Sequence, residues 1–177
     1  TGQPSKTLKG HTGSVHAVSV TPDAKHAISG SKDETCILWD LDAGQPCKTL
    51  KGHTSEVFAV SVTPDGKRAV SGSWDGTCIL WDLDTGQPSK TFKGHTSLVA
   101  AVSVTPDGKR AISGSRDNTC ILWDLDTVQP SKTLKGHTSD VWAVSVTPDA
   151  KRAISGSGDN TCILWDLDTG QPSKTLK

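Results

Sequence analysis

The chain has 177 residues, of which 19 are Lys or Arg and 19 are Asp or Glu, so its formal net charge is zero and its isoelectric point is about 6.9. This balance gives no broad basic field that would attract nucleic acid or an anionic membrane. No apolar run approaches the ~18–20 residues that a membrane-spanning helix needs. The first residues do not resemble a basic-then-apolar signal peptide. We therefore expect one domain, residues 1–177, with no nucleic-acid or membrane partner.

The elements expected along the chain are all strands. After residues 1–9, short segments rich in β-branched and apolar residues cover residues 15–20, 26–31, 35–41 and 46–50, and turn residues separate them. Pro46 and the lysines after it suit an edge strand, where a missing N–H donor and a charge do no harm. Since no segment has helical periodicity, the sequence predicts an all-β chain built from four-stranded antiparallel meanders with strands a, b, c and d.

The meander occurs four times with a period of 42 residues, and this repeat organises the whole chain. Each unit has Gly-His near its start and Trp-Asp near the end of its third strand. A single sheet cannot bury both of its apolar faces, whereas stacked neighbours can. The units are residues 10–51, 52–93, 94–135 and 136–177, and residues 1–9 are an extra copy of strand d that is identical to residues 169–177.

A repeat of ~40–45 residues with Gly-His and Trp-Asp in these places is similar to a blade of a WD40 β-propeller. In such blades the His, a strand-b Ser, the Asp after strand b and the strand-c Trp form a buried hydrogen-bond network. Trp only donates and Asp only accepts, while His and Ser can relay between them. The resemblance implies this structural role for His11, Ser29, Asp33, Trp39, His53, Ser71, Asp75, Trp81, His95, Ser113, Asp117, Trp123, His137, Ser155, Asp159 and Trp165.

The same residues include a Ser, a His and an Asp in every unit, so a catalytic triad is the alternative interpretation. Two observations argue against it. An enzyme rarely needs four identical sites, and the chain has no G-x-S-x-G nucleophile elbow. We therefore expect no enzymatic activity, no catalytic residues and no cofactor.

The cysteines predict neither a metal site nor a disulfide framework. Cys36, Cys78, Cys120 and Cys162 follow the repeat, Cys47 is additional, and no pair has the C-x-x-C spacing typical of zinc sites. We expect these cysteines to be small hydrophobic side chains buried in strands, because free Cys is readily buried. Disulfides between units are the alternative. Reduced cysteines favour a cytoplasmic location.

The four units differ from one another in few places. Thirty of the 42 positions carry the same residue in all four copies, three positions carry four different residues, and a fourth carries three. The meander puts these four positions at one end, because strand a starts there and the b–c connection returns beside that start. The opposite end is nearly invariant.

In the resembled family this d–a/b–c face commonly binds partners, and exposed aromatics beside Arg and Lys are typical of interface hot spots. We name it the variable rim and expect it to bind a protein or peptide. Drift after duplication is the alternative, although equally exposed turns at the other end barely vary. The rim residues are Ser14, His16, Lys32, Glu34, Glu56, Phe58, Trp74, Leu98, Ala100, Arg116, Asn118, Asp140, Trp142 and Asn160.

The number of blades raises a question of assembly. Rings of the resembled family usually have seven or eight blades, and an open half would expose two apolar faces. We expect a homodimer that completes an eight-bladed ring, with a closed four-bladed monomer as the alternative. Each chain carries five copies of strand d for four blades, so one terminal copy should be loosely attached, exchanged or packed outside the ring.

The function expected from the sequence is that of a non-catalytic scaffold that assembles with itself and binds protein or peptide partners on the variable rim. The alternative is a structural product of repeat amplification or design that has no evolved ligand.

Overall fold

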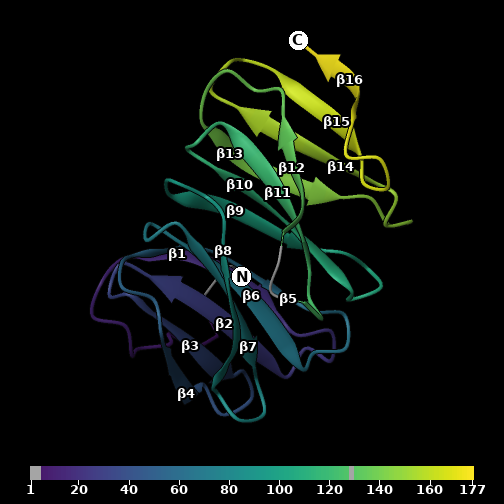
Figure 1. Ribbon diagram of the computed structural model, residues 1–177. Coiled ribbons are helices and arrows are strands. Elements are labelled where there is room, and N and C mark those ends of the chain that lie inside the picture. The colour runs from purple at the N-terminus through teal and green to yellow at the C-terminus, as the bar shows by residue number, and fades with distance from the viewer. Residues whose placement is uncertain (1–4, 128–129) are drawn as a thin grey trace.

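A computed structural model describes residues 5–127 and 130–177 (Figure 1). The regular secondary structure of these residues is sixteen strands, arranged as four four-stranded antiparallel sheets. The sheets follow one another in chain order, from the purple to the yellow end of Figure 1. No helix in this part of the chain has the length and hydrophobicity needed to cross a membrane. The all-β prediction and the four blades are confirmed.

Each blade contains consecutive strands, which pair in the order a-b-c-d. Blade 1 comprises β1 (Val15–Val20), β2 (His26–Ser31), β3 (Thr35–Asp40) and β4 (Gln45–Lys51). Blade 2 comprises β5 (Val57–Val62), β6 (Arg68–Ser73), β7 (Thr77–Asp82) and β8 (Pro88–Lys93). Blade 3 comprises β9 (Val99–Val104), β10 (Arg110–Ser115), β11 (Thr119–Asp124) and β12 (Pro130–Lys135). Blade 4 comprises β13 (Val141–Val146), β14 (Arg152–Ser157), β15 (Cys162–Asp166) and β16 (Pro172–Leu176).

The proline-containing strands β4, β8, β12 and β16 are sheet edges, as the sequence predicted. Their pairing with strand c contains a bulge. In blade 1, Leu38 lies opposite Lys48 and Trp39 lies opposite Pro46, so Cys47 is the extra residue. A bulge of this kind bends a strand and re-aims the side chain at the extra position.

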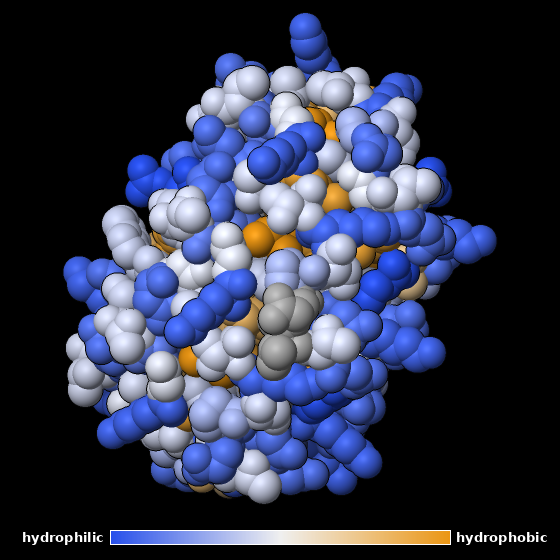
Figure 2. Space-filling model, viewed as in Figure 1, coloured by the Kyte–Doolittle hydropathy of each residue, from blue (hydrophilic) through white to orange (hydrophobic). Residues whose placement is uncertain are grey.

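Neighbouring blades pack face to face through the same junction each time. Ile28, Cys36, Leu38 and Leu50 of blade 1 pack against a set from blade 2 that includes Val57, Ala69, Ile79 and Trp81. Equivalent residues form the next two junctions. The view in Figure 2 is mostly hydrophilic, with small hydrophobic patches, because the junctions take up most of the apolar side chains.

The glycine of each Gly-His pair is required by close packing on the Trp of its own blade. A Cβ at Gly52 would lie 3.0 Å from Trp81 Cη2, and one at Gly10 would lie 2.9 Å from Trp39 Cη2. These glycines do not have a positive φ, so the close approach to the indole is what requires them.

The arc of four blades is open at both ends. Val18, on the outer face of blade 1, is 71% exposed, whereas its equivalent Val60 at an internal junction is 9% exposed. Ile154, on the outer face of blade 4, is 36% exposed, whereas its equivalent Ile28 is fully buried. One chain therefore does not close into a four-bladed ring.

The two terminal copies of strand d differ in structure. The C-terminal copy forms β16, paired with β15, whereas residues 5–9 of the N-terminal copy form no strand. Leu8 nevertheless packs beside the cluster of Ala27, Ile37 and Trp39 on the outer face of blade 1, and Lys6 Nζ donates a hydrogen bond to the Asp42 carbonyl oxygen. The described residues of the N-terminal copy, 5–9, thus lie outside the sheets.

The variable rim and the buried network

The variable positions of each blade are joined by a backbone hydrogen bond at one end of the sheet. The residue after strand b donates its N–H to the carbonyl oxygen of the residue before strand a. The four bonds run from Lys32 to Ser14 (2.8 Å), from Trp74 to Glu56 (2.9 Å), from Arg116 to Leu98 (3.0 Å) and from Gly158 to Asp140 (2.9 Å). The meander therefore brings these positions together, as expected from its geometry.

Side chains from all four blades form one row across this rim. The rings of His16 and Phe58 stack with centroids 4.5 Å apart and planes 4° apart. The ring centroids of Phe58 and Trp74 lie 5.7 Å apart. The Arg116 guanidinium lies 5.8 Å from the Trp74 ring centroid and 5.7 Å from that of Trp142, so it bridges the two indoles. Trp74 and Trp142 are 49% and 50% exposed.

Acidic side chains lie beside the basic side chains of the variable rim. Glu56 lies 3.3 Å from His16 Nε2 and 3.8 Å from Lys32 Nζ, measured from its two carboxylate oxygens. Arg116 Nε donates to Asp140 Oδ2 at 2.8 Å. These contacts cross blade boundaries, so residues that differ between units are matched to their neighbours.

Not every predicted rim residue offers a side chain to solvent. Leu98 is only 2% exposed and Ala100 is half-buried, so unit 3 contributes mainly Arg116. Ser14 is exposed at the outer end of the row.

The fourth variable position has a backbone constraint that the sequence reasoning missed. Glu34, Gly76, Asn118 and Asn160 have φ values of 69°, 78°, 68° and 66°. Gly and Asn are the residues that most readily adopt this left-handed region. The turn explains why Gly76, Asn118 and Asn160 occupy this position but not why Glu34 does, and a binding role for Glu34, Asn118 and Asn160 stays a prediction.

The buried network has the same geometry in every blade. In blade 2, Trp81 Nε1 donates to Ser71 Oγ at 2.7 Å, and His53 Nε2 lies 2.7 Å from the same oxygen. His53 Nδ1 lies 2.9 Å from Asp75 Oδ2. An ionised carboxylate only accepts, so His53 Nδ1–H donates to Asp75 Oδ2, and a ring that is protonated at Nδ1 alone accepts the Ser71 hydroxyl proton at Nε2. The equivalent bonds in the other blades measure 2.7–2.9 Å.

The Asp of each network is held ionised by its donors. Burial acts to raise the pKa of Asp75, but hydrogen bonds from His53, Thr77 and the Thr54 N–H outweigh it and hold the pKa well below the usual range. Asp33 and Asp117 share this balance, and the donors around Asp159, led by Thr161, lower its pKa in the same way.

The Ser, His and Asp are bonded in the same order as in a catalytic triad, but a substrate cannot reach the Ser oxygen. Ser71 is fully buried, and its oxygen already accepts the Trp81 N–H. A nucleophile must reach a substrate carbonyl, which this oxygen does not do. The network therefore fastens strands b and c to the segment that precedes strand a.

The cysteines of the repeat are small apolar side chains at the junctions, as expected. All five cysteines are free. Burial raises the pKa of Cys36, Cys78 and Cys120 to about 12. Cys162 is half-buried because its face of blade 4 has no neighbour.

One group of residues was missed by the cysteine-spacing argument. His26, Asp40 and Cys47 lie together at the end of blade 1 opposite the variable rim. The available signal was that unit 1 has His26 and Cys47 where the other units have Arg and Ser.

The stacked four-stranded sheets, each tied by the same Trp-Ser-His-Asp network, define an array of β-propeller blades. The chain belongs to the WD40 family (WD domain, G-beta repeat), which it matches over residues 2–40, 44–82, 86–124 and 128–166. The second, third and fourth matches begin near strand d of one blade and end with strand c of the next, so the sequence repeat is offset from the structural blade.

Two relatives share shorter stretches with this chain. It is 56% identical over 34 residues to the small ribosomal subunit protein RACK1y of Oryza sativa subsp. japonica, which is 19% of this chain and 10% of that protein. It is 50% identical over 36 residues to eukaryotic translation initiation factor 3 subunit I of Xenopus tropicalis, which is 20% of this chain and 11% of that protein. The matched part is thus about a tenth of either relative.

Proposed function

We propose that this chain is a non-catalytic scaffold that binds a protein or peptide partner across the variable rim. The observation that carries the proposal is the row from His16 to Trp142, in which the residues that differ most between units contact one another across blade boundaries. Membership of the WD40 family supports a scaffold role, because the d–a/b–c face is a common binding surface in that family.

The chemistry of the row favours apolar contact as the source of affinity. Trp and Arg are enriched among interface hot spots. Arg116 is already held between two indoles and bonded to Asp140, so little side-chain entropy is lost when a partner binds. Because Glu56 and Asp140 offset the neighbouring cations, we expect a partner with apolar or aromatic anchors rather than a strongly charged one.

Selection from a random peptide library displayed on phage tests this proposal. Enriched peptides should bind the wild-type chain in calorimetry, and Trp74→Ala or Trp142→Ala should weaken binding about tenfold or more, the effect expected of a hot-spot residue. Lys67→Ala, an exposed change in a turn at the opposite end, is the matched control. If the enriched peptides bind both Trp variants with unchanged affinity, the variable rim is not the binding site and the proposal is refuted. Failure to enrich any peptide would favour the alternative of a repeat product without an evolved ligand.

We also propose that two copies close an eight-bladed ring. The outer face of blade 4, with Ile154 and Leu176, has the sequence of faces that are buried at the three internal junctions. The outer face of blade 1 has the complementary set, including Val15 and Val18. A second copy supplies each face with the neighbour that its equivalents already have, and a two-fold axis makes the two junctions identical.

Charge at the junctions supports the same pairing. Arg68 lies 3.7 Å from Asp126 of the next blade, and Arg110 lies 3.4 Å from Asp168. Both pairs join the first residue of strand b in one blade to an Asp in the c–d turn of the next blade. In the closed ring the blade that follows blade 4 is blade 1 of the other chain, so Arg152 would pair with Asp42 of that chain.

A charge exchange tests the ring. Arg152→Asp and Asp42→Arg each place like charges at both junctions. Each junction then loses ~0.2–1 kcal/mol of attraction and gains a similar repulsion, so each variant alone should dimerise about 4- to 900-fold more weakly. Mixing the two variants restores an opposite-charge pair at each junction, so the heterodimer should form. Light scattering measures the masses. A wild-type mass near 18.6 kDa at all concentrations would refute closure, as would a mixture no more dimeric than either variant.

The location stays a prediction. Five free cysteines suit a reducing compartment such as the cytoplasm.

A further inference from the structure

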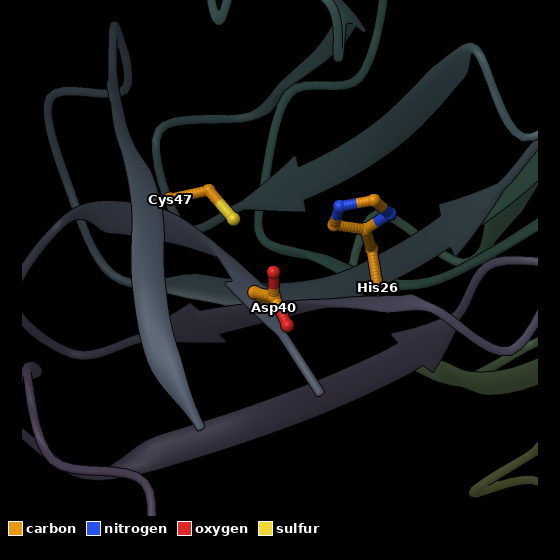
Figure 3. Close-up of side chains that lie close together, drawn as sticks. All are labelled: His26, Asp40 and Cys47. Atoms are coloured by element: carbon orange, nitrogen blue, oxygen red, sulfur yellow. The ribbon is translucent and has the colours of Figure 1, made fainter. Parts of the chain in front are cut away.

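We propose that His26, Asp40 and Cys47 form a zinc-binding site at the end of blade 1 opposite the variable rim. One ligating atom from each residue lies within 4.8 Å of the others. Figure 3 shows the imidazole, the carboxylate and the thiol directed toward one another from three strands. Imidazole and thiolate are ligands that Zn²⁺ prefers, and a carboxylate completes many zinc sites.

The sheet register explains how three strands supply one site. His26 begins β2 and lies opposite Asp40, the last residue of β3, so both side chains emerge on the same face. Cys47 is the extra residue of the β4 bulge, and the bulge re-aims its side chain. The three ligands therefore come from consecutive strands of one rigid sheet.

Comparison with the other blades shows that this place is built to hold a cation. In blade 2, the Arg68 guanidinium donates to the Gly108 carbonyl oxygen at 3.1 Å and pairs with Asp126. In blade 3, Arg110 donates to the Ala150 carbonyl oxygen at 2.8 Å and pairs with Asp168. Unit 1 has His26 at this position.

The shorter His26 leaves room where the guanidinium lies in the other blades. A cavity of about 130 Å³ is lined by His26, Cys47, Gly66 and Asp84, among others. Gly66 and Asp84 are the equivalents of the two groups that Arg68 contacts. Among the described residues, no salt bridge involves Asp84 or Asp40.

A lysine beside the cavity does not exclude a metal ion. Lys48 Nζ donates to the Leu83 carbonyl oxygen at 3.1 Å. In blade 2 the equivalent Lys90 makes the same contact to Leu125 at 3.0 Å, beside Arg68. The surroundings therefore accept a lysine and a second cation together, and blade 1 has one cation fewer.

The geometry needs only side-chain adjustment to bind the ion. With Zn–N and Zn–O bonds of ~2.0–2.2 Å and Zn–S of ~2.3 Å, tetrahedral ligand atoms lie roughly 3.3–3.7 Å apart. The cavity beside His26 and Cys47, which Asp84 also lines, leaves room for a water molecule as the fourth ligand. The zinc ion thus supplies the positive charge that Arg68 and Arg110 supply in the next blades.

Cobalt(II) is the probe for this site, because a thiolate ligand gives Co²⁺ a charge-transfer band and Zn²⁺ then displaces the ion. The reduced wild-type chain should bind one Co²⁺ with this band. Cys47→Ser should abolish the band, and His26→Arg should weaken binding at least tenfold. Both changes introduce the residue that the other three units carry, so folding should be preserved. Cys162→Ser is the thiol control and should keep the band.

A gain of function gives the second arm of the test. Arg68→His together with Ser89→Cys recreates the ligand set around Asp82 in blade 2, and the double variant should bind two Co²⁺ ions. The proposal is overturned if the wild-type chain gives no cobalt–thiolate band, or if the band persists in Cys47→Ser. Unchanged affinity in His26→Arg, or a stoichiometry that stays at one in the double variant, would also overturn it.

Discussion

Ser71→Ala tests the view that the Trp-Ser-His-Asp network holds each blade together. The hydroxyl accepts the Trp81 N–H and donates to His53 Nε2, both at 2.7 Å. Ser71 and Trp81 are fully buried and His53 nearly so. The substitution removes one oxygen atom and leaves a space too small for water.

The expected loss follows from the two groups left without a partner. A buried donor or acceptor that loses its only hydrogen bond costs ~1–3 kcal/mol, so Ser71→Ala should lower the free energy of unfolding by about 2–5 kcal/mol. Denaturation in urea, followed by circular dichroism, measures the loss. Ser89→Ala, an exposed change on β8, should cost less than about 0.5 kcal/mol.

A second substitution separates the network from a packing effect. Trp81→Phe removes the indole N–H, so in the Ser71→Ala background it eliminates the orphaned donor and should cost less than it does in the wild-type chain. If Ser71→Ala costs less than 1 kcal/mol, or if the two substitutions are additive, the network does not stabilise the blade in the way described.

Three further predictions concern pH, turns and thiols. Because the pKa of Asp75 is lowered in the folded state, its contribution to stability is complete above the unfolded pKa of ~3.9 and is lost as the pH falls toward the folded pKa. The free energy of unfolding should therefore decline below about pH 5, and the decline should be less steep in Asp75→Asn. A free energy of unfolding that does not change with pH would contradict this. Ala24 has a φ of 58° and its equivalent Gly66 a φ of 69°, so Ala24→Gly should stabilise and Gly66→Ala destabilise by about 0.5–1 kcal/mol in urea; equal signs would refute the turn argument. A thiol reagent should modify Cys162 in the monomer but not in a closed dimer, where a neighbouring blade would cover it. Buried Cys78 is the control and should stay protected in both states. Labelling of Cys162 in the dimer would argue against closure.

The repeat made most of the fold predictable from the sequence. Turn residues bound each β-branched run so closely that the strands of unit 1 agree with the structure to within a residue at each end. The network was predictable because the resemblance to WD40 blades implied it, and the donors and acceptors of Trp39, Ser29, His11 and Asp33 are compatible with it. The clustering of variable positions followed from antiparallel pairing alone.

Two features required coordinates because they depend on geometry that the pattern does not encode. The left-handed φ of Gly76 and Asn118 shows that the turn restricts which residues fit the fourth variable position. The approach of Cys47 to His26 depends on a one-residue bulge, which changes the register between Leu38 and Trp39. Cysteine spacing along the chain could not reveal ligands that lie on adjacent strands.

Residues 5–9 and β16 each lack some of the contacts that strand d makes in an internal blade. Leu8 packs beside Trp39 as Leu50 packs beside Trp81, but its segment pairs with no strand. Leu176 pairs with Cys162 in β16 but is 40% exposed, because no next blade covers it. In the eight-bladed ring that we propose, a second copy would bring the outer faces of blades 1 and 4 together, so that one segment would make both sets of contacts and the other would be displaced. Since the sequences are the same, the side-chain contacts do not distinguish them. The choice is then set by chain connection, which favours β16 because the Asp166–Gly170 turn already ties it to β15.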